Sequence, residues 1–294
     1  MRVTKQKKPK AKVKGYDELQ FTDDFLFCKV LENNEELCKE LLELILRKKI
    51  RKINYLAKQK VIDITSDGKG VRLDVYLEDD KNTVFDIEMQ TSTSKNLPKR
   101  TRYYQGMIDL NLIEKGADYK ELKKSYIIFI CMQNPFKQKN LHLYTFENRC
   151  NENTELLLGD ESTKVILTPE GCANDVSTEL SEFLNYLAGK GGNSAFVKRL
   201  DAAVDKAKNK EEWRMEYMTL LMRDREKFEQ GLEQGLEQGL EQGREQERYD
   251  AIRRLIQNKC TRDFILNLGY TEEEFAEATM DDEKFYLEGT PEQN

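Results

Sequence analysis

Hydrophobic and polar residues alternate in two short runs near the middle of the chain. Residues 71–77 read VRLDVYL and residues 83–90 read TVFDIEMQ, and the polar stretch EDDKN separates them. A period of two is typical of β-strands, and two such runs joined by a polar turn predict a hairpin. The run from Lys58 to Thr65, which ends in the turn SDGKG, adds a strand before them. The pattern therefore predicts a three-stranded meander.

A period of three to four residues predicts helices on both sides of this meander. One helix is expected to begin after Thr22 or Asp23 as its N-cap, and a second covers about Glu35 to Arg47. Pro98 suits the first turn of another helix, which ends near Gly116.

A continuously apolar run, SYIIFICM at residues 125–132, predicts a strand that is covered on both faces. Because a helix leads into it, we expect this strand to join the sheet in parallel through a crossover. Residues 142–169 add a hairpin or two further strands. The order of the main elements is therefore helix, three strands, helix, strand.

Beyond Ser177 the periodicity predicts helices alone. Within a long charged helix from about Glu211, residues 228–243 repeat the tetrapeptide EQGL and place glycines four residues apart, at Gly231, Gly235, Gly239 and Gly243. Each glycine costs a helix about 1 kcal/mol relative to alanine. Two interpretations stay open: the stripe lets a second helix approach closely, as in a homo-oligomer through Gly231–Gly243, or the segment is a semi-flexible tether.

The tail of the chain predicts three short amphipathic helices, with Thr261 and Thr271 as N-caps. Together these patterns divide the chain into four parts. We expect a disordered basic tail at residues 1–15, an α/β domain at 16–170, a helical region with the EQGL helix at 171–248, and a small helical hairpin at 249–294.

Composition excludes several classes of protein. The net charge of −6 argues against a protein that coats nucleic acid indiscriminately, and no apolar run approaches the roughly 18 residues of a membrane span. The chain starts with a basic stretch that lacks the apolar core of a secretion signal. The six cysteines form no CxxC pair, which favours the reducing cytoplasm and disfavours zinc.

His142 is the single histidine, so a structural role is expected for it and histidine-based nucleophile chemistry is disfavoured. The glycine-rich segment LAGKGGNS around Lys190 lacks the Gly and Ser/Thr positions of a phosphate-binding loop. We interpret it as a turn between helices and expect no nucleotide cofactor.

Both strands of the predicted hairpin carry acidic residues. Leu73, Val75 and Leu77 would share one face, which leaves Asp74 on the other, and Glu88 likewise lies opposite the apolar face of its own strand. If the two polar faces meet in one cleft, Asp74 and Glu88 can hold one hard divalent cation, Mg²⁺ or Mn²⁺. Two carboxylates on adjacent strands are weak evidence alone, because most such pairs are solvated surface.

The segments RLDVY, IEMQ and PKRTRYYQGMIDLNLIEKG resemble the Rpn family of recombination-promoting nucleases and transposases, which belongs to the PD-(D/E)XK nucleases. The resemblance is strong from roughly Thr22 to Pro135. It implies an α/β fold with a restriction-endonuclease-like αβββαβ core, a mixed sheet flanked by helices. The helical pattern beyond Ser177 adds an all-α C-terminal region after this core. The resemblance further implies a metal-dependent DNA endonuclease with little sequence preference, acting in DNA recombination or in mobile elements.

The resemblance also implies roles for individual residues. Gln90 stands where the usual lysine of the motif stands, so the catalytic set would be Asp74, Glu88 and Gln90, with Gln90 orienting water or contacting phosphate. An acidic residue of the first helix faces the metal in this family, which makes Asp24 a weaker third ligand. Its alternative role is to complement the helix dipole.

The basic start of the helix after the hairpin is the expected DNA-binding segment. Its candidate contacts are Lys99, Arg100, Arg102, Tyr103 and Tyr104. An alternative for Arg100 and Tyr104 is an i,i+4 pair on one helix face, and Tyr104 can also belong to the core.

Three classes of function follow from these patterns. The first is the metal-dependent endonuclease, which we favour. The second is a catalytically inactive relative that binds DNA or a protein, and the third is an assembly protein whose glycine-striped helix drives oligomerisation.

Overall fold

The computed structural model describes residues 13–62, 70–92, 96–136 and 140–287. Most of the basic tail, the predicted strand end at Asp63–Thr65 and most of the SDGKG turn therefore lie outside the described residues. Contacts within the chain divide it into two units, Met1–Tyr217 and Met218–Asn294. Each unit is described by itself below.

The first unit is built on a mixed six-stranded sheet with the strand order β1-β2-β3-β4-β6-β5. Its strands are β1 (Ile53–Ile62), β2 (Val71–Asp79), β3 (Val84–Gln90), β4 (Ser125–Cys131), β5 (Leu143–Phe146) and β6 (Ser162–Leu167). The first three form the predicted antiparallel meander, and β4 pairs with β3 in parallel, as the crossover predicted. The two added strands are β6, parallel to β4, and β5, antiparallel to β6.

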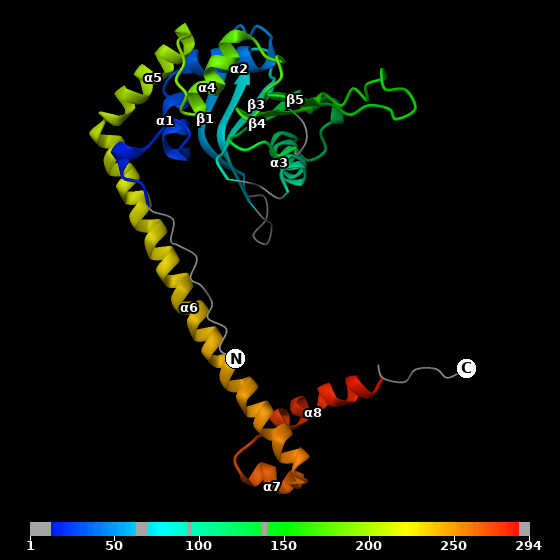
Figure 1. Cartoon of the computed structure of the whole chain (residues 1–294). Coiled ribbons are helices and arrows are strands. Elements are labelled where there is room, and N and C mark those ends of the chain that lie inside the picture. The colour runs from blue at the N-terminus through cyan, green and yellow to red at the C-terminus, as the bar shows by residue number, and fades with distance from the viewer. Residues whose placement is uncertain (1–12, 63–69, 93–95, 137–139, 288–294) are drawn as a thin grey trace. The chain divides into compact units, whose positions relative to one another are not determined.

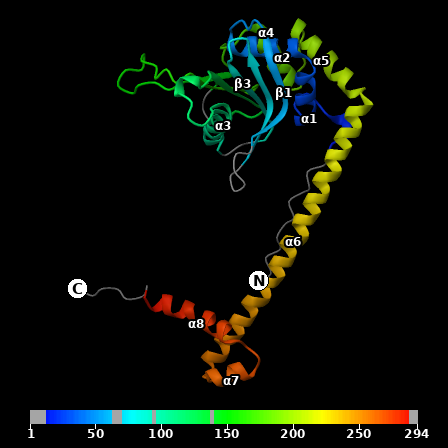
Figure 2. The ribbon, with the colours of Figure 1, turned by 180° about the vertical axis from the view of Figure 1, so that it is seen from behind.

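Helices cover both faces of this sheet (Figure 1). One face carries α1 (Asp24–Glu32), α2 (Glu35–Leu46), α4 (Thr178–Leu187) and α5 (Ala195–Lys208), and the other carries α3 (Leu97–Leu112). Figure 2 shows the same two layers from behind. Two short 3-10 turns, Tyr16–Glu18 and Tyr119–Glu121, complete the described elements of this unit. The predicted αβββαβ core and its α/β class are confirmed.

The helices α4 and α5 belong to the first unit. Their buried residues Leu180, Phe183 and Phe196 join one apolar core with residues of α1 and α2. Trp213, near the start of α6, is buried in the same core. The sequence placed a boundary after residue 170, whereas the contacts divide the chain after Tyr217. The two boundaries differ because of tertiary contacts: the apolar faces of α4 and α5 are buried against α1 and α2, which come from the beginning of the sequence.

The turn between α4 and α5 is the predicted glycine-rich one. Gly189 and Gly191 have φ angles of 73° and 77°, a conformation that favours glycine. Elsewhere in the unit, the imidazole Nδ1 of His142 lies 2.9 Å from a carboxylate oxygen of Asp175, and the backbone N–H of His142 donates to the other oxygen. His142 thus fastens a loop, the structural role expected for it.

The second unit contains most of α6 (Glu211–Gln257), a continuous helix of 47 residues that includes the EQGL repeat. The residues AIRRLIQNK, expected to form a separate short helix, fall largely within the end of α6. Its partners α7 (Arg262–Asn267) and α8 (Glu272–Leu287) pack around Ile252, Ile265 and Ala278. Thr261 and Thr271 cap these helices as predicted, because their hydroxyls accept bonds from the N–H groups of Phe264 and Glu274.

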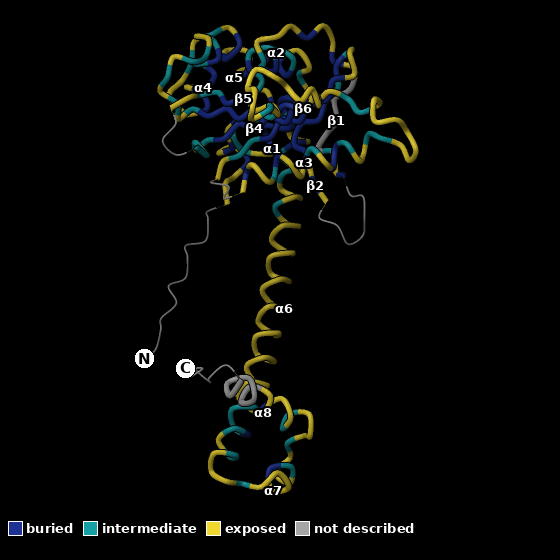
Figure 3. The backbone as a smooth tube through the Cα atoms, turned by 90° about the vertical axis from the view of Figure 1, so that its right-hand side faces the viewer, coloured by how far each residue is buried: buried dark blue, intermediate teal, exposed yellow. Residues whose placement is uncertain are grey.

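The repeat itself is exposed throughout (Figure 3). Leu232, Leu236 and Leu240 are each more than half exposed. Within the described part of the chain, a Cβ added at any of the four repeat glycines would meet no atom within 4 Å beyond its chain neighbours and the adjacent backbone of its own helix. Among the helices described, none combines the length and the apolar character that crossing a membrane requires.

Candidate active site

The strands β2 and β3 separate where their acidic residues lie. Their ladder pairs Glu78 with Val84 and ends at the pair Val75 and Ile87, although both strands continue beyond it. Beyond that point, the N–H of Asp74 donates to Glu88 Oε1 at 2.9 Å, and the N–H of Met89 donates to Asp74 Oδ2 at 3.2 Å. Each carboxylate therefore accepts a bond from the backbone of the opposite strand, which holds Asp74 and Glu88 together.

The separation also changes which way the neighbouring side chains face. Leu73 packs in the core beneath α3, whereas Val75 and Leu77 pack in the core beneath α1 and α2. The prediction that these three residues share one face is therefore wrong for Leu73. Strict alternation holds only in a regular strand, and the alternation of β2 changes phase at Asp74.

Burial and mutual repulsion act together on the acidic residues of these strands. Asp74 is 6% exposed and Glu88 only 1%. Burial first, and then the charge of Glu88, raise the pKa of Asp74 to about 8. Burial also raises the pKa of Glu88 to about 6, against the opposing effects of the Asp74 N–H and of Arg100. Such paired, buried carboxyl groups favour a nearby cation, because a cation stabilises the ionised forms.

Asp86, which is two residues before Glu88 on β3, is a third buried carboxyl group. Its side chain is fully buried, and burial raises its pKa well above the usual value, with further raising by the charges of Glu88 and Asp74. The two-residue spacing puts Asp86 and Glu88 on one face of a regular strand, but the sequence did not single out Asp86 as a site residue.

Arg100 brings a positive charge to this cleft from the first turn of α3. Its Nη2 donates to Glu88 Oε2 at 2.8 Å, and its Nη1 donates to Gln90 Oε1 at 2.6 Å. The hydroxyl of Tyr104 accepts from Nε and Nη2 of the same guanidinium, at 3.0 and 2.7 Å. The predicted i,i+4 contact of Arg100 and Tyr104 therefore exists, and it aims the guanidinium at the carboxylate.

The five predicted DNA-binding residues divide by the direction they face. Arg100 and Tyr104 face inward, and Tyr104 is only 7% exposed, so its ring offers no free face for stacking. Its place is to support Arg100. Lys99, Arg102 and Tyr103 are exposed on the same helix. The amide nitrogen of Gln90 donates to the backbone oxygen and the hydroxyl of Ser92, at 2.8 and 3.1 Å.

Asp24, the weaker predicted ligand, lies beside Asp74. Its Oδ2 accepts from Arg72 Nη2 at 2.7 Å, and the same nitrogen is 3.9 Å from Asp74 Oδ1. Cys28 follows one helical turn later, with its Sγ 3.7 Å from Asp24 Oδ1. Among the residues that the structure describes, the group that could hold a metal ion is Asp24, Cys28 and Asp74, whose ligand atoms all lie within 4.8 Å of one another.

The sequence did not single out Arg72 or Cys28 as site residues. A signal was present for both: Arg72 is two residues from Asp74 on one strand, and Cys28 is four residues after Asp24 on one helix.

The donors suit a hard divalent cation. Asp74 and Glu88 offer buried carboxylate oxygens, and Asp24 adds a carboxylate oxygen that lies within 4.8 Å of one of Asp74. In this structure Arg100 and Arg72 supply the positive charge beside these groups. The residues present therefore fit a metal ion of this class.

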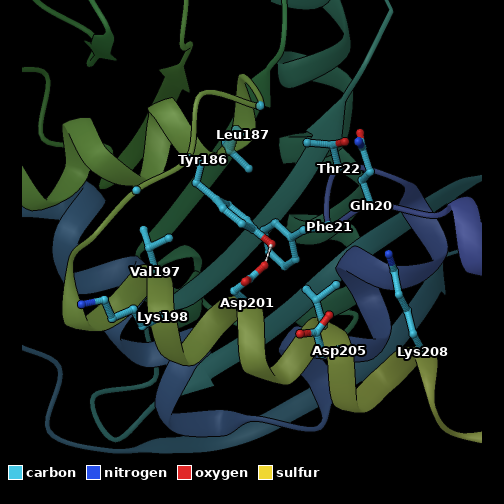
Figure 4. A pocket seen from close by; sticks show the side chains of 14 residues that line it. Gln20, Phe21, Thr22, Tyr186, Leu187, Val197, Lys198, Asp201, Asp205 and Lys208 are labelled. Carbon is cyan, nitrogen blue, oxygen red and sulfur yellow. Dashed lines mark hydrogen bonds between the residues drawn. The ribbon is translucent and has the colours of Figure 1, made fainter.

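A separate hollow of about 410 Å³ lies on the other side of the sheet from α3 (Figure 4). It is bounded by residues 20–22, the end of α4, the glycine-rich turn and α5. Within it, the hydroxyl of Tyr186 bonds to Asp201 at 3.2 Å. None of the predicted site residues lines this hollow.

Residues 21–161 match the family model described as PD-(D/E)XK nuclease family transposase. The matched stretch contains every candidate site residue, from Asp24 to Tyr104, and over these residues the match agrees with the family that the sequence resembles. No curated protein and no solved structure matches the chain.

Proposed function

We propose that this chain, whose residues 21–161 form a domain of the PD-(D/E)XK nuclease family transposases, is a metal-dependent DNA endonuclease that hydrolyses phosphodiester bonds with little sequence preference. One observation carries the proposal. The backbone bonds across the separated strands hold Asp74 and Glu88 together, buried and next to the guanidinium of Arg100.

Asp74 and Glu88 are the proposed ligands of Mg²⁺, with Mn²⁺ as the alternative ion and Asp24 as a weaker third ligand. When bound, such an ion activates water for attack and stabilises the negative charge that develops on the phosphate. The chain prepares the site by burying both carboxylates, which is the main cause of their raised pKa values, and a bound cation would stabilise their ionised forms.

Gln90 completes the proposed catalytic set. Its carbonyl oxygen fixes Arg100, which places a positive charge close to where the lysine of the usual motif would place one. Its amide nitrogen now bonds Ser92, and in the proposed reaction it donates to the attacking water or to phosphate. In this proposal the neutral Gln90 can replace the lysine because Arg100 of α3 supplies the positive charge.

DNA is the proposed substrate, and the exposed side of α3 is its proposed contact surface. Lys99 and Arg102 would bind phosphates, and Tyr103 would pack beside the backbone or an unstacked base. Recombination or mobile-element biology is the setting that the family suggests. We place the activity in the cytoplasm, which agrees with the presence of six cysteines, all described, of which none forms a disulfide.

The test is conversion of supercoiled plasmid to nicked and linear forms by the full chain, with Mg²⁺, with Mn²⁺ and with EDTA. We expect cleavage that needs metal and is lost in Asp74→Asn and in Glu88→Gln. Glu78→Gln is a matched control, because Glu78 lies on β2 but bonds Lys123 and Tyr76 instead of the site. Cleavage that survives EDTA, or survives both site variants, contradicts the proposal.

A catalytically inactive DNA-binding protein is the second candidate. It is favoured by one observation, namely that Arg100 and Arg72 already neutralise Glu88 and Asp24 by ion pairs. Folded protein that retards DNA but cleaves under none of the metal conditions would select this candidate.

A further inference from the structure

The cluster of Asp24, Cys28 and Asp74 has a different ligand chemistry from the pair Asp74 and Glu88. It combines one sulfur with two carboxylates, and the cysteine that supplies the sulfur, Cys28, is only 2% exposed. Hard cations such as Mg²⁺ take oxygen ligands, whereas thiolate ligands select softer ions. Asp74 belongs to both sets, and so does Asp24 as the weaker third ligand proposed for Mg²⁺, so the two sets overlap in one cleft.

We propose that Asp24, Cys28 and Asp74 form a binding site for a thiophilic divalent cation of the zinc class, and that its occupancy blocks the endonuclease. The binding part stands by itself. The inhibitory part rests on the proposed function, because it follows from the sharing of Asp74, and of Asp24 as the weaker ligand, with the catalytic metal.

The spacing of the ligand atoms suits such an ion. Zinc takes Cys and Asp ligands in tetrahedral sites with bonds of about 2.0–2.3 Å, which separates neighbouring ligand atoms by roughly 3.6 Å. Cys28 Sγ and Asp24 Oδ1 are 3.7 Å apart, and all three ligand atoms lie within 4.8 Å of one another. Three protein ligands leave the fourth position open for water.

Arg72 is a second, independent indication that this cluster holds positive charge. Its guanidinium lies 2.7 Å from Asp24 Oδ2 and 3.9 Å from Asp74 Oδ1, so a cationic group already occupies the mouth of the cluster. The Arg72 side chain is half exposed. It can therefore turn into solvent when a metal ion enters, without disturbing the core.

Glu88 takes no part in this second site. Arg100 and the N–H of Asp74 hold its two oxygens, on the α3 side of the cleft. A variant at Glu88 should therefore remove cleavage and leave the thiophilic site intact, which separates the two proposals experimentally.

The experiment is titration of the full chain with Co²⁺, the spectroscopic substitute for Zn²⁺, in wild type, Cys28→Ser, Asp24→Asn, Glu88→Gln and Cys172→Ser. We expect a sulfur-to-cobalt charge-transfer band in wild type, Glu88→Gln and Cys172→Ser. Cys28→Ser should lose the band, and Asp24→Asn should weaken binding about tenfold or more. Cys172, an exposed thiol, controls for adventitious binding.

Absence of the band in wild type, its persistence in Cys28→Ser, or unchanged affinity in Asp24→Asn overturns the proposed site. Asp24→Asn keeps the test valid if Cys28→Ser fails to fold, since the Asp24 side chain is half exposed. A second readout is inhibition of Mg²⁺-supported cleavage by Zn²⁺, expected in wild type and lost in Cys28→Ser. A cobalt band without any nuclease activity would leave the thiophilic site standing and refute the endonuclease alone.

Discussion

The two units of this chain use glutamate in opposite ways. In the first unit, Glu88 is 1% exposed and bonded to the backbone of the neighbouring strand and to Arg100. In the second unit, Glu233, Glu237 and Glu241 recur every four residues on α6 and are exposed. Water solvates the repeated carboxylates, whereas the fold holds the buried one against other charges. Burial and enforced proximity, and not the number of acidic residues, therefore mark the candidate site.

Removing the buried carboxylates should have the largest effect. Asp74→Asn or Glu88→Gln should lower the initial rate of plasmid nicking by about 10³-fold, because several kcal/mol of transition-state stabilisation are lost. The triple change of Glu233, Glu237 and Glu241 to Gln should alter that rate by less than about twofold, as expected of solvated charges. Loss of nicking in the triple variant would contradict the conclusion that only the buried carboxylates belong to the site.

Arg100→Met should follow, with a fall of about 10²-fold in the nicking rate, because the charge beside Glu88 and Gln90 is removed. Arg102→Met, an exposed change on the same helix, should weaken DNA binding by a few-fold and lower its salt dependence. Nicking rates at saturating DNA separate the two. If Arg100→Met, like Arg102→Met, left the nicking rate at saturating DNA unchanged, Arg100 would contribute to DNA binding alone.

The pH dependence of stability should have opposite signs in the two units. Asp74 has a pKa of about 8 in the folded protein against 3.8 in the unfolded chain, so its stabilising proton is present below about pH 4 and lost as the pH rises through about 8. Glu274 in the second unit has its pKa lowered to about 2, mainly by Arg248, so its contribution is lost as the pH falls from about 4.5 through about 2.

Urea unfolding of metal-free protein measures this contrast. Trp213 is the single tryptophan and is buried in the first unit, so its fluorescence reports that unit. Its unfolding free energy should decline between about pH 4 and pH 8, and Asp74→Asn should flatten the decline. A decline that persists unchanged in Asp74→Asn would assign it to other groups.

Gln90→Lys should lower activity instead of restoring a usual motif. The new ammonium would lie where Gln90 Oε1 accepts from Arg100 at 2.6 Å, so repulsion replaces a hydrogen bond at a cost of about 1–3 kcal/mol. The nicking rate and the melting temperature should both fall. Gln90→Glu keeps an acceptor for Arg100 and is the matched control; a gain of activity in Gln90→Lys would refute the role given to Arg100.

The smallest expected effect concerns the glycine stripe. Replacing Gly231, Gly235, Gly239 and Gly243 by Ala should strengthen α6 by about 1 kcal/mol per residue, because each new methyl group enters open space. Helical circular dichroism on heating measures the gain. Mass in solution decides between the two interpretations of the stripe: a fall in mass indicates a close helix contact between copies, and an unchanged mass indicates a tether.

Local pattern predicted most of the fold, because each element is encoded by its own residues. The starts of β2 at Val71 and β4 at Ser125 follow from alternation and from a continuous apolar run. The convergence of Asp74 and Glu88 follows from the hairpin that carries them. The separation of the two strands could not be predicted from the hairpin pattern. It depends on the carboxylates of Asp74 and Glu88, which accept backbone hydrogen bonds in place of the regular ladder.

Contacts between distant segments were beyond the sequence pattern. Arg72 meets Asp24 across 48 positions of the chain, and no periodicity encodes such a pair. The inward direction of Arg100 depends on the packing of α3 beneath the sheet, where Tyr104 and Phe129 lie against the guanidinium. For the same reason, the membership of α4 and α5 in the first unit required the structure.

The first turn of α3 carries residues of two kinds within four positions. Lys99 and Arg102 are exposed, while Arg100 reaches Glu88 on the inner side. Pro98 fixes the backbone at the start of this turn. Under the proposed function, a phosphate bound by Lys99 or Arg102 would therefore lie within one helical turn of the guanidinium that contacts Glu88.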